Sequence, residues 1–204
     1  MSSGANLHWT GFHTVEGATL PVPMPISRQS SAETLLKKLQ NHTLLSMPRV
    51  KQAVTFSREA YGDRRHWSGI TLEEHVLSSV QILLPFSPDE ESVIACLLQH
   101  VPSLPHLNVA AVRTSFGPIV STLVSSIHLL SHVTTSNRRM SVEHLRLMFL
   151  RVSRDIRVTL VLLCSQVALL PELSNMPVEQ LRNFTRDILR IYSPVAARLG
   201  IYSL

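Results

Sequence analysis

The sequence predicts an all-α protein, a bundle of about nine or ten helices packed around one core. Helix-start signals recur along the chain, and apolar residues at the spacing of one helix face follow them. No segment shows the alternation of apolar and polar residues that marks a half-buried strand. The 204 residues are 45% hydrophobic and 16% charged, which is enough for one domain with a sizeable core and too apolar for a disordered chain.

The N-terminal residues 1–29 are expected to form a flexible or extended arm. They are rich in turn-forming residues and contain the run Pro-Val-Pro-Met-Pro at 21–25. They lack a basic start followed by an apolar stretch, so the sequence indicates no secretory signal. The helical domain is therefore predicted to occupy residues 30–204.

Three capping boxes predict where helices begin. In each box a hydroxyl accepts a hydrogen bond from a free backbone N–H, and the Glu three residues later reaches back to the cap residue. In the third box Pro88 occupies the first helical position, which proline favours. The boxes pair Ser30 with Glu33, Thr71 with Glu74, and Ser87 with Glu90.

The remaining helices follow from apolar periodicity and from breaking residues. Gly117 with Pro118, and later Pro171, are expected to end helices. The apolar run from Val158 to Leu170 is too short to span a membrane, which needs ~20 residues, so a buried core helix is predicted there. The further helices are expected at about 48–60, 108–115, 117–131, 141–152, 155–170, 177–190 and 192–199.

Charge and cysteine content restrict the function classes. The net charge of +5 permits an anionic partner, but the basic residues are scattered, so no nucleic-acid-binding tail and no direct DNA binding are expected. Cys96 and Cys164 lie within apolar runs and are predicted to be buried thiols. Two cysteines exclude a disulfide scaffold and fit a reducing compartment.

Three stretches, taken in order, resemble the N-terminal hydrolase domain of the RelA/SpoT family. The first is AYGDRRHWSG at 60–69, continuing to His75. The second comprises FG at 116–117, LRLMFL at 145–150 and DIRV at 155–158. The third, IYSPVAARLGIY at 191–202, is similar to the family's link from hydrolase to synthetase domain. The resemblance covers about 32–204 and implies an HD-type bundle.

The resemblance also implies where a metal would bind. In the family, one His, a His-Asp pair and a distant Asp hold a divalent ion, usually manganese, that activates water against the 3′-pyrophosphate of guanosine tetraphosphate. The first ligand matches His75, and the distant Asp matches Ser165. The His-Asp pair matches Gln99 and His100. Only His75 and His100 are left as metal-binding side chains, without a carboxylate.

The other family site residues are changed as well. An acidic pair that helps to activate water matches Ser103 and Leu104. An Arg that stacks on the base matches His66, beside Arg64 and Arg65, which are the candidates for a remaining nucleotide contact. General-base help is worth roughly 10²–10⁴ in rate, so hydrolysis is expected to be lost, and no cofactor is expected.

The sequence and the resemblance together predict a degenerate (p)ppGpp hydrolase domain of a stringent-response protein, acting in the cytoplasm without a membrane. Its expected partner is a (p)ppGpp synthetase domain in cis or another RelA/SpoT-type protein. The chain ends where the resemblance places the start of the synthetase, so the chain by itself is not expected to be an enzyme, whereas a parent protein would be a GTP pyrophosphokinase.

Two alternatives stay open from the sequence. One is an active phosphohydrolase with a rearranged Mn²⁺ site, in which His106 joins His75 and His100, and Asp63 or Glu74 supplies a carboxylate. The other is a non-catalytic sensor that binds guanine nucleotide through three arginines. These are Arg64, Arg65 and Arg157.

Overall fold

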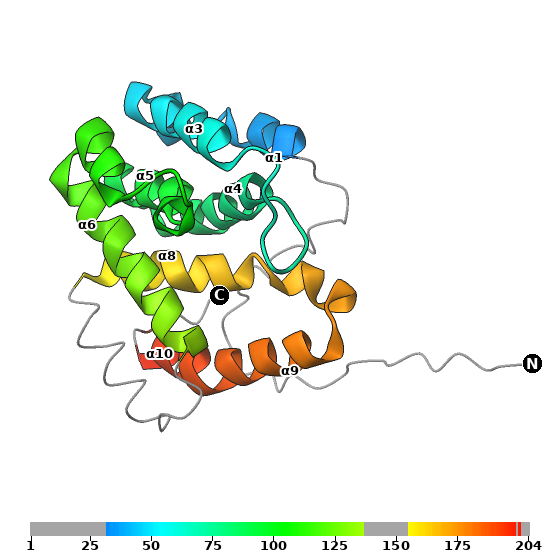
Figure 1. The fold of residues 1–204 in the computed structure, drawn as a ribbon. Coiled ribbons are helices and arrows are strands. Elements are labelled where there is room, and N and C mark those ends of the chain that lie inside the picture. The colour runs from blue at the N-terminus through cyan, green and yellow to red at the C-terminus, as the bar shows by residue number, and fades with distance from the viewer. Residues whose placement is uncertain (1–31, 137–154, 199, 201–204) are drawn as a thin grey trace, which may run out of the picture.

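Helices supply the regular structure of the computed structural model, which describes residues 32–136, 155–198 and 200 (Figure 1). Within these ranges no strand occurs, and one isolated bridge pairs Arg65 with Thr71. The predicted all-α class is confirmed. In chain order the α-helices are α1 (Ala32–Leu39), α2 (Thr43–Ser46), α3 (Pro48–Tyr61), α4 (Leu72–Leu83), α5 (Glu90–Leu98), α6 (Val109–Ser136), α8 (Ile156–Val167), α9 (Val178–Asp187) and α10 (Ser193–Arg198).

The helices lie in layers around α4 and α8, which pack against each other (Figure 1). α1 and α3 cover one side, α5 lies beside α4, and α6 crosses the edge of both α5 and α8. α9 and α10 form the opposite layer. Residues 92–98 of α5 are all buried, so this helix is the centre of the core.

Helix α8 is a core helix. The stretch Ile156–Ser174, which continues α8 into the 3₁₀ helix Leu170–Asn175, is long and apolar enough to cross a membrane by length and composition alone. Half of the most apolar part of this stretch is buried inside the fold, and α8 packs against α4, α5 and α6. The core helices of globular proteins can be equally long and apolar, so we interpret α8 as the buried helix that the sequence predicted.

The start of α4 confirms one predicted capping box. Thr71 Oγ1 accepts from the backbone N–H of Glu74 at 3.1 Å, and the backbone N–H of Thr71 donates to Glu74 Oε2 at 2.9 Å. The cap fixes the first turn of the helix that carries His75. The box predicted at Ser30 lies outside the described residues, as does the helix predicted at 141–152.

The box predicted at Ser87 is wrong. Helix α5 begins at Glu90, and Asp89 is its N-cap, with Oδ1 accepting from the N–H of Ser92 at 2.8 Å. Ser87 has a left-handed backbone with φ of 50° and ends the 3₁₀ turn Leu84–Phe86. The Asp89 carboxylate is also paired with Arg157 at 2.7 Å, and this long-range contact favours the later start.

The predicted break at 117–118 appears as an interruption within α6. Gly117 has φ of 88° and ψ of 177°, and its peptide joins two helical segments. A Cβ at this position would have no heavy atom within 4 Å, so the cost of any side chain is one of backbone conformation. Only glycine adopts this region readily.

Replacing Gly117 by Ala should therefore lower the free energy of unfolding by about 1–3 kcal/mol. The measurement is urea denaturation followed by circular dichroism, with Thr114→Ala as the control at an exposed helical position of α6. Equal stability of Gly117→Ala and wild type would show that the observed backbone conformation at this position is not required.

The C-terminal helices are continuous rather than separate as predicted. A π-helical turn, Ile188–Tyr192, joins α9 to α10. A small second core cluster of Leu169, Met176 and Phe184 holds α9 against the end of α8. This arrangement places α9 on the side of α8 that lies away from α4 (Figure 1).

Candidate functional site

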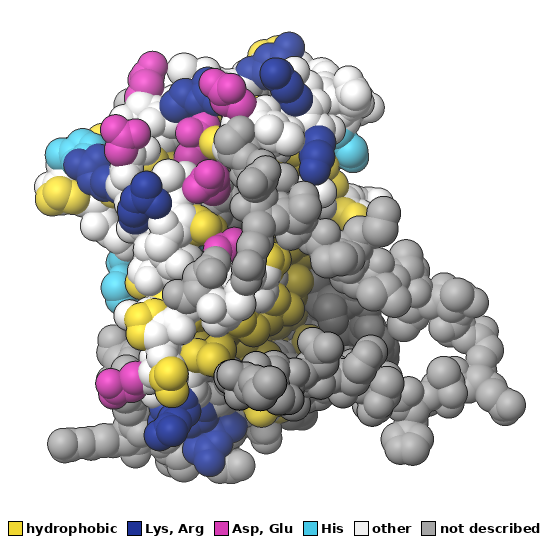
Figure 2. All heavy atoms as spheres, turned by 90° about the vertical axis from the view of Figure 1, so that its right-hand side faces the viewer, with side chains coloured by type: hydrophobic (Ala, Val, Ile, Leu, Met, Phe, Trp, Pro, Cys, Tyr) yellow, Lys and Arg dark blue, Asp and Glu magenta, His cyan; other side chains and the backbone are white. Residues whose placement is uncertain are grey.

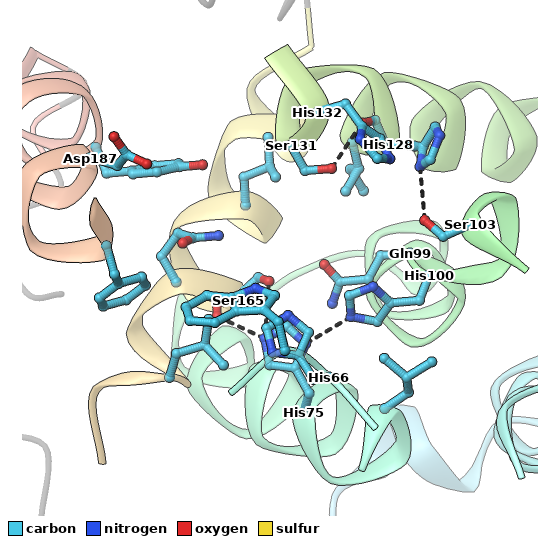
Figure 3. Close-up of a pocket in the computed structure, with 18 of the residues that line it drawn as sticks. His66, His75, Gln99, His100, Ser103, His128, Ser131, His132, Ser165 and Asp187 are labelled. Carbon is cyan, nitrogen blue, oxygen red and sulfur yellow. Dashed lines mark hydrogen bonds between the residues drawn. The ribbon is translucent and has the colours of Figure 1, made fainter. Parts of the chain in front are cut away.

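A cavity of about 750 Å³ lies between α4, the end of α5, α6 and α8 on one side and α9 on the other (Figure 3). The positions that the sequence analysis matched to the family's metal, water-activating and base-stacking residues line this one cavity, together with the two arginines beside His66. They are Arg64, Arg65, His66, His75, Gln99, His100, Ser103, Leu104 and Ser165. These residues are spread over 102 positions of sequence (64–165), so the fold brings them together.

Three imidazoles form a cluster on the α4 wall of the cavity. His75 Nδ1 lies 2.8 Å from His100 Nε2, and the ring of His66 stacks on that of His75 with centroids 4.4 Å apart. One ring nitrogen from each of the three residues lies within 4.8 Å of the other two. We call His66, His75 and His100 the histidine cluster.

The hydrogen bonds of the histidine cluster fix the tautomer of its buried member. His75 Nε2 lies 3.0 Å from the carbonyl oxygen of Ser165, which can only accept, so Nε2 carries the proton. A neutral imidazole has one N–H, and His75 Nδ1 therefore accepts from His100 Nε2. The ring of His66 is held from its other side by Ser68, whose Oγ lies 3.0 Å from Nδ1.

Burial keeps the histidine cluster uncharged. It lowers the pKa of His75 to about 4, against the weaker opposing effect of the Ser165 carbonyl. Burial also lowers the pKa of His66 to about 3, and the charge that His75 would carry adds to this shift. The pKa of His100 is lowered well below its ordinary value by burial and by the neighbouring imidazoles. At neutral pH each of the three rings is therefore uncharged and has one nitrogen lone pair that can bind a metal ion.

Tyr61 supports the cluster from below, and sequence reasoning missed it. Its fully buried hydroxyl donates to the carbonyl oxygen of Leu97 at 2.7 Å and accepts from the backbone N–H of His100 at 3.3 Å. Burial raises the pKa of Tyr61, so the phenol stays protonated. A buried Tyr at a helix end has no signal in sequence that identifies its partner.

The polar residues beside the cluster make neutral contacts. Gln99 is buried, and its Nε2 donates to the carbonyl oxygen of Cys96 at 3.1 Å. The hydroxyl of Ser103 lies 3.4 Å from His128 Nδ1 on α6 (Figure 3). Among the described lining residues Asp187 is the one carboxylate, and Figure 3 shows it on the α9 wall, away from the histidine cluster.

Several residues of the sequence hypotheses are not brought to the cluster. The Glu74 carboxylate is used by the cap of α4, and Asp63 does not line the cavity. His106 is exposed and lies 3.4 Å from Arg64. Arg157, assigned to a nucleotide sensor, instead forms ion pairs on the far end of α8. Its partners there are Asp155 and Asp89.

Basic side chains line the cavity from both walls. Arg64 and Arg65 come from the loop before α4, where Arg65 donates to the carbonyl oxygen of Gly69 at 2.7 Å. Arg186 and Arg190 come from α9 and the π-helical turn, and sequence reasoning missed them. Their separation by four residues within a helix was the available signal.

The face of the molecule drawn in Figure 2 shows charges of both signs among the described residues. On the face drawn in Figure 2, Lys and Arg are mixed with Asp and Glu at the height of α1 and α3, and hydrophobic side chains appear in the recess below them. On this face the described residues agree with the scattered basic charge of the sequence.

An all-α bundle with histidines from separate helices facing one cavity defines the class of site. Residues 53–202 match the family model of the HD domain, and the chain belongs to that family as a RelA/SpoT-type HD domain. It is 28% identical to the bifunctional (p)ppGpp synthase/hydrolase SpoT of Escherichia coli K12 over 157 residues, 76% of this chain and 22% of SpoT.

Other curated relatives have related names. The guanosine-3′,5′-bis(diphosphate) 3′-pyrophosphohydrolase of Aquifex aeolicus is 25% identical over 174 residues, 85% of this chain and 25% of that protein. The GTP pyrophosphokinase rsh of Brucella ovis is 24% identical over 156 residues, 76% of this chain and 21% of that protein. The chain thus spans between about a fifth and a quarter of the relatives it matches.

Proposed function

We propose that this chain is a catalytically degenerate (p)ppGpp hydrolase domain that regulates a (p)ppGpp synthetase in the cytoplasm. The synthetase would be a linked domain or another RelA/SpoT-type protein. One observation carries the proposal: the cavity is retained, while the matched metal and water-activating positions around it hold imidazole, amide, hydroxyl and alkyl groups. These positions are His75, Gln99, His100, Ser103, Leu104 and Ser165.

The chemistry of these groups explains why hydrolysis would be lost. Mn²⁺ prefers oxygen ligands, and the histidine cluster supplies neutral nitrogen donors alone. The Mn²⁺ that the family resemblance implies therefore does not fit the described residues of this site. Among the described residues no carboxylate lies beside the cluster to remove a proton from water, and such a base contributes about 10²–10⁴ in rate.

The direct test incubates the purified chain with ppGpp and Mn²⁺ and measures pyrophosphate release, with Escherichia coli SpoT as the positive control. We expect release at the background rate, at least about 10²-fold below SpoT. Release at a rate comparable to SpoT would overturn the loss of hydrolysis.

A variant that restores the matched carboxylates tests whether hydrolysis is absent because the ligands were replaced or because the cavity does not form. Carboxylates returned to this cavity should allow Mn²⁺ to bind and raise pyrophosphate release above that of the wild type. The wild-type chain and the variant with Gln99 and His100 alone replaced are the matched controls. The full variant carries Gln99→His, His100→Asp, Ser103→Glu, Leu104→Asp and Ser165→Asp.

The regulatory part needs a separate measurement. Synthesis of (p)ppGpp by a protein containing this chain and a synthetase domain should change when the chain is removed. An unchanged rate of synthesis with and without residues 32–204 would exclude control of that synthetase.

A second candidate function is a guanine-nucleotide sensor. The arginines on both cavity walls favour it, because guanidinium groups match phosphate oxygens in geometry and charge. Calorimetric titration with guanosine tetraphosphate and GTP tests this function, and no heat of binding at millimolar nucleotide would exclude it. The active hydrolase with a rearranged carboxylate has less support, since Glu74 serves the cap of α4.

A further inference from the structure

The histidine cluster has the donor set of a metal site that differs from a manganese hydrolase site. It offers three nitrogens from three separate segments: the loop before α4, α4 itself, and the turn that follows α5. Zn²⁺ binds imidazole nitrogen at about 2.0–2.1 Å in tetrahedral sites, and three protein ligands are enough when the fourth position is open. A site made of nitrogen ligands binds late transition ions such as Zn²⁺ more tightly than it binds Mn²⁺.

We propose that His66, His75 and His100 together bind one zinc ion, which joins the loop at 62–71 to α4 and to the end of α5. The site is assembled from this chain's own residues, and His66 is its distinctive member, since it stands where the family resemblance implies an arginine. The proposal does not depend on whether the domain hydrolyses nucleotide.

The distances require a small adjustment. Two nitrogen ligands at about 2.0–2.1 Å from a tetrahedral ion lie about 3.4 Å apart, and His75 Nδ1 and His100 Nε2 are 2.8 Å apart. The ion would take the place of the proton that these two nitrogens share, with a slight separation of the rings. His66 stacks on the face of His75 with an interplanar angle of 26°, so metal binding requires its ring to turn until a nitrogen lone pair points at the ion. The His66 ring is partly buried and belongs to a loop rather than to a core helix, which makes this turn possible.

The contact behind His75 orients its ring as a metal-binding histidine requires. The His75 Nε2–H donates to the Ser165 carbonyl, which directs the lone pair of Nδ1 into the cluster. Ser68 holds the His66 ring, and Tyr61 holds the backbone of His100. The Ser165 carbonyl behind His75 is thus the outer-shell acceptor that is usual for a metal-binding histidine, while Ser68 and Tyr61 fix the positions of the other two residues.

The fourth position of the ion faces the cavity that all three histidines line. Water or an anionic ligand would complete the tetrahedron there. Three neutral ligands leave the full positive charge of the ion on this position, and the nearby arginines make an anion the favoured occupant.

The experiment measures metal binding directly. The full 204-residue chain is stripped with a chelator, dialysed, and titrated in parallel with Zn²⁺ and Mn²⁺, and bound metal is quantified by mass spectrometry. We expect one Zn²⁺ per chain and Mn²⁺ binding at least about 100-fold weaker. Co²⁺ in place of zinc should give the intense visible absorption of a tetrahedral nitrogen site. Wild-type chain that retains no stoichiometric zinc would overturn the proposal.

Variants assign the ligands. His66→Gln and His100→Gln should each weaken zinc binding by about 100-fold or more, since even outer-shell changes cost 10–100-fold. His106→Gln, at an exposed histidine near the cavity rim, is the matched control and should bind as wild type does. Circular dichroism establishes that each variant is folded. Unchanged zinc binding in His66→Gln, or loss of zinc in His128→Gln instead, would refute the assignment.

Discussion

Replacing Tyr61 by Ala is expected to lower the free energy of unfolding by about 4 kcal/mol. The ring is fully buried among α3, α4 and α5, and truncation leaves a cavity that a close-packed core cannot fill. The change also leaves the Leu97 carbonyl and the His100 N–H without their hydroxyl partner, which costs further free energy in a buried place. Urea denaturation followed by circular dichroism measures the loss.

Tyr61→Phe separates the two contributions. It keeps the ring volume and removes the hydroxyl alone, so it should cost about 1–2 kcal/mol, less than half of the loss in Tyr61→Ala. The same variant should loosen His100, whose backbone the hydroxyl holds. A loss below about 1 kcal/mol for Tyr61→Ala would show that the surroundings collapse around the missing ring.

The sequence predicted helix starts and interruptions correctly where one or two neighbouring residues determine the backbone conformation. Thr71 caps α4 because its hydroxyl and Glu74 satisfy each other, whatever the rest of the fold does. Gly117 with Pro118 interrupts α6 for an equally local reason. The start of α5 was mispredicted because Arg157, 68 residues further along, holds Asp89. Local sequence patterns do not predict an N-cap whose position depends on an ion pair with a distant residue.

The sequence predicted which residues line the candidate site, but it did not predict how their side chains are arranged. The positions matched through the family resemblance all line one cavity, although helices from several parts of the chain supply them. The stacking of His66 on His75 depends on the turn at 66–70, closed by the His66 N–H to the Ile70 carbonyl at 2.8 Å. No sequence spacing predicts this approach, so the sequence interpretation left two matched imidazoles as metal-binding candidates where the structure places three imidazoles together.

The stability of the metal-free protein should fall as the pH drops from about 6.5 toward 4. The pKa of His75 is lowered to about 4 in the folded chain by burial, whereas an imidazole in the unfolded chain titrates near 6.5. Between these values the unfolded state binds a proton that the folded state does not, so acid favours unfolding. At pH 5 this residue alone should remove about 2 kcal/mol relative to pH 7, and its cluster neighbours add to the loss.

The control is His75→Gln, which removes the titrating ring and leaves an amide of comparable size. Free energies of unfolding are measured by urea at pH 7, 6 and 5 in the presence of a chelator, so that no metal holds the histidines neutral. The difference between pH 7 and pH 5 should be smaller in the variant by about 2 kcal/mol. His66 and His100 face His75 and keep part of the dependence in the variant. Identical pH dependence of the two proteins would mean that the His75 ring is protonated as readily in the folded chain as in the unfolded chain, which would contradict its burial between Ser165 and His100.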